Sequence, residues 1–296
     1  MKIRPIILIL FIAAFIAMTI RVFFIESYKI ATDSMSDTHK SGVCLLVEKW
    51  TLGALIPFSH RQRVSGFGSI ERNDLIVYKQ PLIRPSSPRN RDLLSRCIGL
   101  PGETLYLSND TVLVNNQLLN RPKTIVECYR FSSEAENTLK KQIIRLKLSA
   151  AIYEKGDVGY VYLNKWDWYK LYTSKPLEKS TLEKESWVMQ PIHLKIPKKG
   201  MKIPLNDSTL QLYGNIIQNF EEVKITRDSV GRIYKNGYLA HLYVFKQNYY
   251  FLMNDHQGHL NDSRQFGVIP ESLFVGRACF VLFSPENKRF MQKISN

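Results

Sequence analysis

The residue pair Ser34-Met35 is the first feature of this sequence that could do chemistry. A serine hydroxyl can attack an amide carbonyl when a base takes its proton and hydrogen-bond donors stabilise the developing oxyanion. Ser34 lies nine residues after Ile25, where a long apolar run ends, so even an extended chain keeps it near that end. The pair alone indicates little, and its weight depends on the segments that accompany it.

Histidines and cysteines could support a different chemistry. His256 and His259 have the spacing of a pair of metal ligands, but no third ligand is evident in the sequence. The 4 cysteines are far apart and form no C-x-x-C pair, so they lack the spacing of a zinc or thioredoxin motif. One disulfide could form in an oxidising compartment, although the sequence does not pair the cysteines. A metal site is therefore not indicated.

The element that must position Ser34 is an apolar segment near the N-terminus. Pro5–Ile20 contains no charge, and four more apolar residues follow Arg21. A helix of about 21 residues rises about 31 Å, enough to cross the hydrocarbon core of a bilayer. Lys2 and Arg4 precede the segment, which favours a cytoplasmic N-terminus and a translocated remainder. We expect an uncleaved membrane anchor over residues 1–27; a cleaved secretory signal is the alternative.

The charge of the chain is skewed, with 41 Lys+Arg against 26 Asp+Glu and a net charge of +15. Such an excess favours nucleic acid or an anionic membrane surface as a partner. A nucleic-acid binder would need the opposite topology and a basic helix or an aromatic platform, and neither motif is found. We therefore expect a membrane lipid surface and no nucleic acid. Trp50–Phe58, followed by His60, Arg61 and Arg63, is either an ordinary loop or core strand, or an interfacial hairpin with its apolar side in lipid.

Short apolar runs bounded by turn residues predict a mostly β fold behind the anchor. Strands are expected at residues 43–47, 75–78, 104–107, 111–114, 117–119, 231–234 and 238–244, with Asn236-Gly237 as a hairpin turn. Residues 124–227 are richer in lysine and helix formers, and helices are expected at Ser132–Leu148 and Lys165–Leu171. The predicted division is 1–27 (anchor), 28–123 (first part of the core), 124–227 (an inserted α+β subdomain) and 228–296 (second part of the core).

Four segments in a fixed order behind the anchor resemble the type I signal peptidases, membrane-anchored serine endopeptidases that remove signal peptides. KIATDSM (29–35) resembles the nucleophile box K-I-P-[ST]-x-S-M, and RNDLIVYKQP (72–81) resembles the strand R-G-D-[IV]-V-V-F. SRCIGLPGE (95–103) resembles K-R-x-[IV]-G-x-P-G-[DE], and YYFLMNDHQGHLNDSRQFGVIPESLFVGRA (249–278) resembles Y-F-[MV]-x-G-D-N-R…D-S-R-x-[WF]-G-x-[VI]-P followed by G-[KR]-A. The resemblance covers somewhat over half of the chain and excludes the middle block. It implies a signal peptidase-like β core with an inserted second domain.

The resemblance assigns roles to individual residues. Ser34 becomes the nucleophile, and its backbone N–H and the Thr32 hydroxyl become the oxyanion donors; Thr32 as a plain turn residue is the alternative. Asp262, Ser263 and Arg264 match the D-S-R segment that orders the site in the family, and a surface ion pair is the alternative. No metal and no organic cofactor is implied.

The chain departs from the family pattern at the site itself. The family's base is a neutral, desolvated lysine, and its position here is Ser95, whose hydroxyl holds its own proton too tightly to replace an amine. Eukaryotic-type relatives use a histidine, and His256 is the best substitute base because its box lines the site in the family; a solvated loop histidine is the alternative. Further departures are Ala31 for Pro, Asp33 for a small residue, Ser36-Asp37 for Glu-Pro, Asn254-Asp255-His256-Gln257 for Gly-Asp-Asn-Arg, and Leu260 for Ser.

These observations predict a divergent bacterial signal peptidase I-like endopeptidase that lacks the usual lysine. We expect it in the inner (cytoplasmic) membrane, crossing once, with its C-terminal domain on the periplasmic or extracytoplasmic side. The expected substrates are signal-peptide-bearing precursors, bound in extended form by strand addition. The alternative is a catalytically silent paralogue that binds signal peptides or a partner at the membrane. The missing lysine favours that alternative, whereas the retained Ser34 opposes it.

Overall fold

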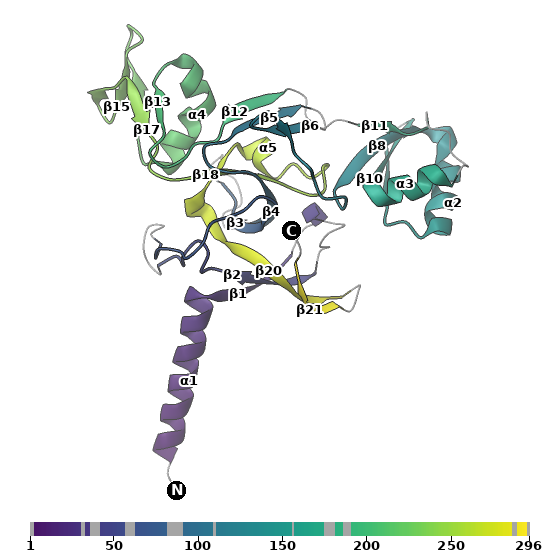
Figure 1. Cartoon of the computed structure of the whole chain (residues 1–296), viewed down its shortest axis with the longest axis horizontal. Coiled ribbons are helices and arrows are strands. Elements are labelled where there is room, and N and C mark those ends of the chain that lie inside the picture. Colours follow the sequence, from purple (N-terminus) through teal and green to yellow (C-terminus); the bar gives the residue numbers. More distant parts are fainter. Residues whose placement is uncertain are drawn as a thin grey trace.

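The computed structural model describes residues 3–30, 33–35, 42–56, 63–81, 91–108, 111–155, 157–174, 181–185, 191–285 and 289–294. A long N-terminal helix projects from a central antiparallel sheet, and two further lobes lie beyond the sheet (Figure 1). The protein is mostly β, with one apolar N-terminal helix among the residues that the structure describes, as predicted.

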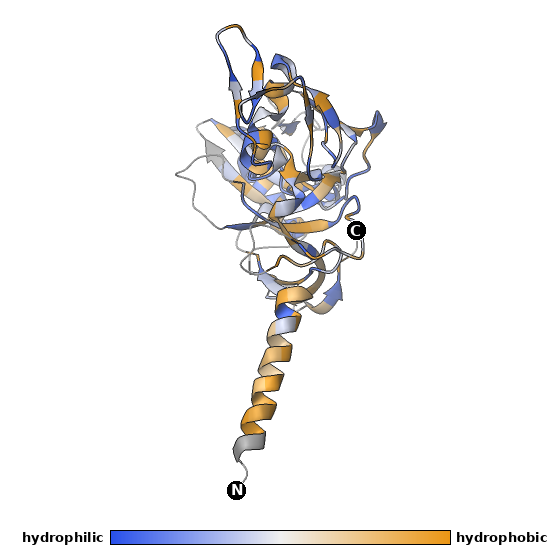
Figure 2. Cartoon of the chain, turned by 90° about the vertical axis from the view of Figure 1, so that its left-hand side faces the viewer, coloured by the Kyte–Doolittle hydropathy of each residue, from blue (hydrophilic) through white to orange (hydrophobic). Residues whose placement is uncertain are grey.

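Helix α1 (Ile3–Phe23) stands clear of the body and is apolar over most of its length (Figure 2). Its span Ile6–Phe23 is long and apolar enough to cross a membrane, and none of that span is buried in the protein. The Lys49 ammonium donates to the carbonyls of Arg21 (3.1 Å) and Val22 (3.4 Å), so a cation satisfies the negative end of the helix. The predicted helix is confirmed but ends at Phe23, because the chain enters the sheet directly after it.

The central sheet has the order β1-β2-β20-β3-β4-β18-β19, with β21 paired to β20. β3 lies inside it, and its side chains alternate between two cores: Leu75 and Val77 pack with Met35, and Ile76 and Tyr78 pack on the opposite face. Burial on both faces explains why this strand is an unbroken apolar run in the sequence. The strands are β1 (Ile25–Lys29), β2 (Cys44–Glu48), β3 (Leu75–Lys79), β4 (Asp92–Gly99), β18 (Tyr249–Met253), β19 (Ile269–Pro270), β20 (Phe274–Ser284) and β21 (Arg289–Lys293).

One lobe beyond the sheet is built around α4 (Asp207–Phe220). Sequence reasoning missed this helix, which begins at an Asn206–Thr209 capping box. Asn236 and Gly237 both have positive φ, as the predicted hairpin turn requires. The lobe's strands are β5 (Thr104–Ser108), β6 (Thr111–Val114), β7 (Gln117–Leu118), β12 (Ile192–Lys195), β13 (Lys202–Pro204), β14 (Ile225–Arg227), β15 (Ile233–Lys235), β16 (Tyr238–Leu239) and β17 (Leu242–Val244).

The other lobe has its own sheet, of order β11-β8-β10-β9, and its own apolar core. The helices predicted within it are confirmed as α2 (Glu136–Leu146) and α3 (Lys165–Thr173). Its strands are β8 (Val126–Ser132), β9 (Ala151–Lys155), β10 (Val158–Asn164) and β11 (Glu183–Lys184). The predicted block 124–227 therefore contains two packing groups, since β12 and α4 pack in the lobe described first and not with β8–β11. Residues 126–185, which contain β8–β11, α2 and α3, form the subdomain.

Candidate active site around Ser34

Ser34 lies in η1 (Asp33–Met35), a short 3-10 turn that packs against β4. Ser34 is 7% exposed, and the side chain of the next residue, Met35, is fully buried in the core under the sheet. The Ser34 carbonyl accepts a hydrogen bond from the His256 N–H at 3.0 Å. The Asp255 N–H lies 3.4 Å from the Met35 sulfur. The nucleophile turn is thus held by the segment that follows β18, although more than half of the chain separates them in sequence.

Ser95, at the position of the family lysine, is on β4 and fully buried. Its Oγ donates to Asn254 Oδ1 at 2.7 Å and lies 3.1 Å from the Tyr78 hydroxyl. Burial raises the pKa of Tyr78 well above its usual range, so the phenol stays protonated. Neither hydroxyl can therefore take a proton from Ser34 near neutral pH.

Arg96, the next residue along β4, forms a bidentate ion pair with Asp255. Arg96 Nε and Nη2 donate to the two Asp255 oxygens at 2.8 and 2.6 Å, and Nη1 donates to the Asn73 carbonyl at 2.9 Å. The two side chains are only 3% and 1% exposed. Because an unpaired buried charge is costly, this pair fixes the segment after β18 on β4.

The Asp262-Ser263-Arg264 segment forms the start of α5 (Ser263–Phe266). Asp262 caps this short helix by accepting from the Arg264 N–H at 2.9 Å, and it also accepts from the Asn254 N–H at 2.8 Å. The Arg264 guanidinium binds the same carboxylate and donates to the Gln257 carbonyl at 2.8 Å. The Ser263 hydroxyl accepts from a backbone N–H of β18. These residues are buried and bind the segment 254–257, so they do not form a surface ion pair.

His256 is buried rather than solvated. Its ring lies between Tyr162 and His259, with centroid distances of 4.6 and 4.5 Å. Nδ1 accepts a hydrogen bond from the Gly258 N–H at 3.2 Å. In a neutral imidazole one nitrogen donates and the other accepts, so this bond leaves the proton on Nε2. His256 can accept a proton only when the bond to Gly258 opens.

The subdomain reaches this segment directly. The Val126 N–H donates to the Asp255 carbonyl at 2.9 Å, and the Gln257 N–H donates to the Val126 carbonyl at 3.0 Å. The Tyr162 ring covers Gly258 so closely that a Cβ there would lie 2.7 Å from a ring carbon. Sequence reasoning missed both Val126 and Tyr162, since no local pattern links a strand of the subdomain to a distant loop.

Several residues considered from the sequence are not fully described by the structure. Thr32 and the side chain of Asp33 lie outside the described residues, as does His60. The Lys79 ammonium, at the end of β3, lies 3.8 Å from an Asp92 carboxylate oxygen, and both side chains are partly exposed. The described part of the site therefore consists of Ser34, the segment 254–264, β4 and two residues of the subdomain.

The predicted interfacial segment is described only in part. Trp50 follows Lys49, the residue that caps α1, and the Phe67 N–H donates to the Trp50 carbonyl at 2.9 Å. Trp50 and Phe67 are 40% and 89% exposed. Exposed aromatic side chains thus lie beside the end of the apolar helix, where a bilayer surface would be.

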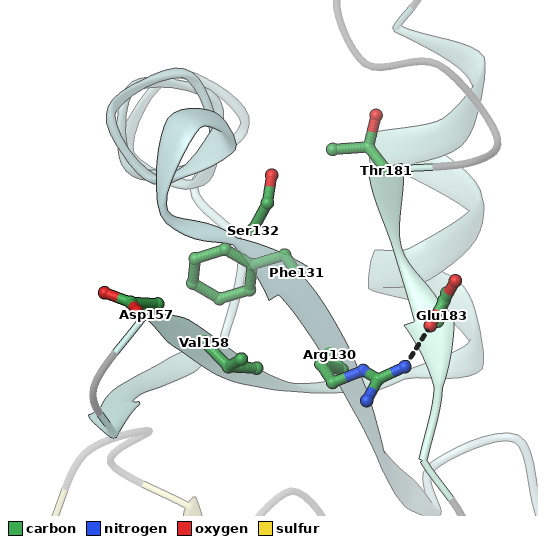
Figure 3. Close-up of a pocket in the computed structure, with 7 residues that line it drawn as sticks. All are labelled: Arg130, Phe131, Ser132, Asp157, Val158, Thr181 and Glu183. Atoms are coloured by element: carbon green, nitrogen blue, oxygen red, sulfur yellow. Dashed lines mark hydrogen bonds and ion pairs between the residues drawn. The ribbon is translucent and has the colours of Figure 1, made fainter.

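A hollow in the subdomain lies at the ends of β8 and β10 (Figure 3). Phe131 and Val158 line it, and Asp157 lies at its rim. Arg130 and Glu183 form an ion pair across one side of it. The ion pair neutralises two of its charges and leaves that of Asp157, and the hollow contains none of the reactive residues predicted from the sequence.

Comparisons with known proteins show which family the chain resembles. The family model described as signal peptidase, peptidase S26, matches residues 3–158 and 194–283. The signal peptidase I of Buchnera aphidicola subsp. Schizaphis graminum is 25% identical over 280 residues, which cover 94% of this chain and 74% of that protein. The signal peptidase I of Pseudomonas fluorescens is 30% identical over 159 residues, 50% of this chain and 54% of that protein. A crystal structure of a signal peptidase I from Enterococcus faecalis is 15% identical, covering 71% of this chain and 96% of that chain with a TM-score of 0.29.

The buried Arg96–Asp255 pair generates a stability prediction. Arg96→Met leaves Asp255 buried without its partner, so the free energy of unfolding should fall by about 3–5 kcal/mol. Denaturant unfolding of the detergent-solubilised chain measures this change. Arg130→Met is the control, because it breaks the exposed pair with Glu183 and should leave the midpoint almost unchanged. Equal losses in the two variants would contradict the role given to the buried pair.

Proposed function

This chain belongs to the signal peptidase S26 family, and we propose that it is a membrane-anchored serine endopeptidase that removes signal peptides from secretory precursors. The observation that carries the proposal is the position of Ser34. Its turn is buried and bonded through its own carbonyl to the His256 N–H. The Asp262–Arg264 segment holds the same stretch of chain from the other side.

In the proposed reaction, the Ser34 oxygen attacks the carbonyl carbon of the scissile peptide bond. The Ser34 N–H and the Thr32 hydroxyl donate to the oxyanion that forms. The Ser34 proton passes to a base and then to the leaving amine, which departs as the new N-terminus of the mature protein. Water next hydrolyses the ester on Ser34 and releases the signal peptide. The base cannot be Ser95, because its hydroxyl is itself a donor to Asn254.

We propose His256 as the substitute base. Its backbone already contacts the Ser34 turn, and its ring is buried against the rings of Tyr162 and His259. The ring must release the Gly258 N–H before its Nδ1 can receive the proton. This requirement makes opening of the 256–258 turn part of the proposed catalytic cycle.

The proposed location is the outer face of the cytoplasmic membrane. Helix α1 would hold the site within reach of a signal peptide that crosses the same bilayer. The exposed Trp50 and Phe67 side chains, beside the end of α1, would rest in the lipid interface. A chain with a net charge of +15 would also be attracted to anionic headgroups.

One observation favours a second candidate function. The family's amine is replaced by a hydroxyl that is buried and already hydrogen-bonded, so the family's own proton acceptor is missing. A protein with this site could bind signal peptides at the membrane without cleaving them. The next experiment separates the two functions.

Replacing the nucleophile tests the endopeptidase. The detergent-solubilised wild type should cleave a signal-bearing precursor, and Ser34→Ala should reduce the cleavage rate by at least about 1,000-fold while the precursor still binds. The readout is the appearance of mature protein on a gel. Ser208→Ala, an exposed serine on α4, serves as the control and should cleave like the wild type. If the wild type binds the precursor but does not cleave it at high enzyme concentration, the binding protein is the correct reading.

The pH profile tests the base. If His256 takes the proton, it must be deprotonated in the free enzyme, so kcat/KM should fall when the pH is lowered far enough to protonate the ring and should level off at higher pH. His256→Gln should remove this dependence on pH together with most of the activity. His193→Gln is the matched control on β12, remote from Ser34 in the fold. An unchanged profile in His256→Gln would exclude His256 as the base.

A further inference from the structure

Three departures from the family motifs lie in three separate segments of the sequence and meet at one point in the structure. Tyr78 stands at the Phe of the β3 motif, Ser95 at the Lys of the β4 motif, and Asn254 at the Gly of the motif after β18. Their side chains are all fully buried. Polar side chains in such a place must satisfy one another, because an unpartnered buried polar group loses its hydrogen bonds to water and gains none in return.

The three side chains form one chain of hydrogen bonds. Ser95 Oγ donates to Asn254 Oδ1 at 2.7 Å, so the Ser95 proton is used and Tyr78 is the donor in the 3.1 Å contact between the two hydroxyls. The Tyr78 hydroxyl also lies 3.5 Å from the Asn261 carbonyl, a second acceptor in the loop that carries Asn254. Asn254 Nδ2 donates to the His259 carbonyl at 2.8 Å. The chain of bonds thus runs from the strand that carries the lysine position into the loop that contacts Ser34. All of its members are neutral.

We infer that Tyr78, Ser95 and Asn254 act as a single neutral unit that fills the place of the family's lysine and positions the loop 254–259 beside Ser34. The Asn254 amide, 2.7 Å from Ser95 Oγ, occupies space through which a lysine at position 95 would have to extend. A lysine there would also place its amine next to the Tyr78 phenol and the Asn254 amide, whose positions suit the Ser95 hydroxyl. The lysine can therefore return only when the other two positions return with it.

This coupling is testable without catalysis. Ser95→Ala and Asn254→Gly each remove one member of the unit, so their effects on the thermal midpoint of the full chain should be far from additive, and the double variant should lose little more than the worse single variant. Ser95→Ala combined with Asn248→Gly is the control, since Asn248 bonds elsewhere, and its effects should add. Additive losses for Ser95 and Asn254 would overturn the inference.

The second arm rests on the proposed function and measures cleavage. Ser95→Lys alone should lower the thermal midpoint and give no gain in precursor cleavage. The triple variant Tyr78→Phe/Ser95→Lys/Asn254→Gly should recover the midpoint and cleave at least about tenfold faster than the wild type, with the gain lost on adding Ser34→Ala. If the wild type does not cleave the precursor, the proposed endopeptidase is wrong. Cleavage by the triple variant that Ser34→Ala abolishes would still support the coupling of the three positions. A single Ser95→Lys variant as stable and as active as the triple variant would overturn the coupling.

Discussion

The geometry of the site depends on the buried ion pair between Arg96 and Asp255. Withdrawing two charges from water is costly, and such a pair persists only when its geometry is good and the remaining donors are satisfied. Both conditions hold, since Arg96 binds both oxygens of Asp255 and its remaining Nη1 donates to Asn73. The position of Asp255 then determines that of the next residue, because the His256 N–H is directed at the Ser34 carbonyl. One strand, β4, therefore carries both Ser95, at the position of the family's lysine, and Arg96, which anchors the residue next to His256.

The same segment joins the subdomain to the core. Backbone bonds link Val126 to Asp255 and to Gln257, so β8 begins on the site itself. Tyr162 then lies over Gly258 and against the His256 ring. Any movement of the subdomain would be transmitted to His256 through these contacts. The subdomain therefore packs as a separate unit and also forms one side of the site.

Much of the fold follows from local patterns in the sequence. The apolar run 75–78 predicts β3 because both faces of that strand are buried, and Asn236-Gly237 predicts its hairpin because both residues adopt positive φ. Helix α4 was missed although Asn206 is a preferred N-cap residue and Tyr213, Ile216 and Ile217 follow it at helical spacing. For the site, the motifs indicate which residues are present but not how their side chains are bonded. Motifs give the identity of Ser95 and Asn254, but their hydrogen bond depends on strand pairing and register between distant segments, which no local pattern contains.

The ion pairs of the site limit which groups could take the Ser34 proton. Arg96 and Arg264 are each matched by a buried carboxylate, so neither those cations nor their partners are available as bases without breaking an ion pair. Tyr78 and Ser95 are neutral donors in a closed chain of bonds. Among the described residues of the site, the remaining candidates are the His256 and His259 rings, which contact each other, and His256 Nδ1 accepts from the Gly258 N–H at 3.2 Å. Hydrolysis with His256 as the base would therefore depend on opening of the 256–258 turn, which frees Nδ1 from the Gly258 N–H.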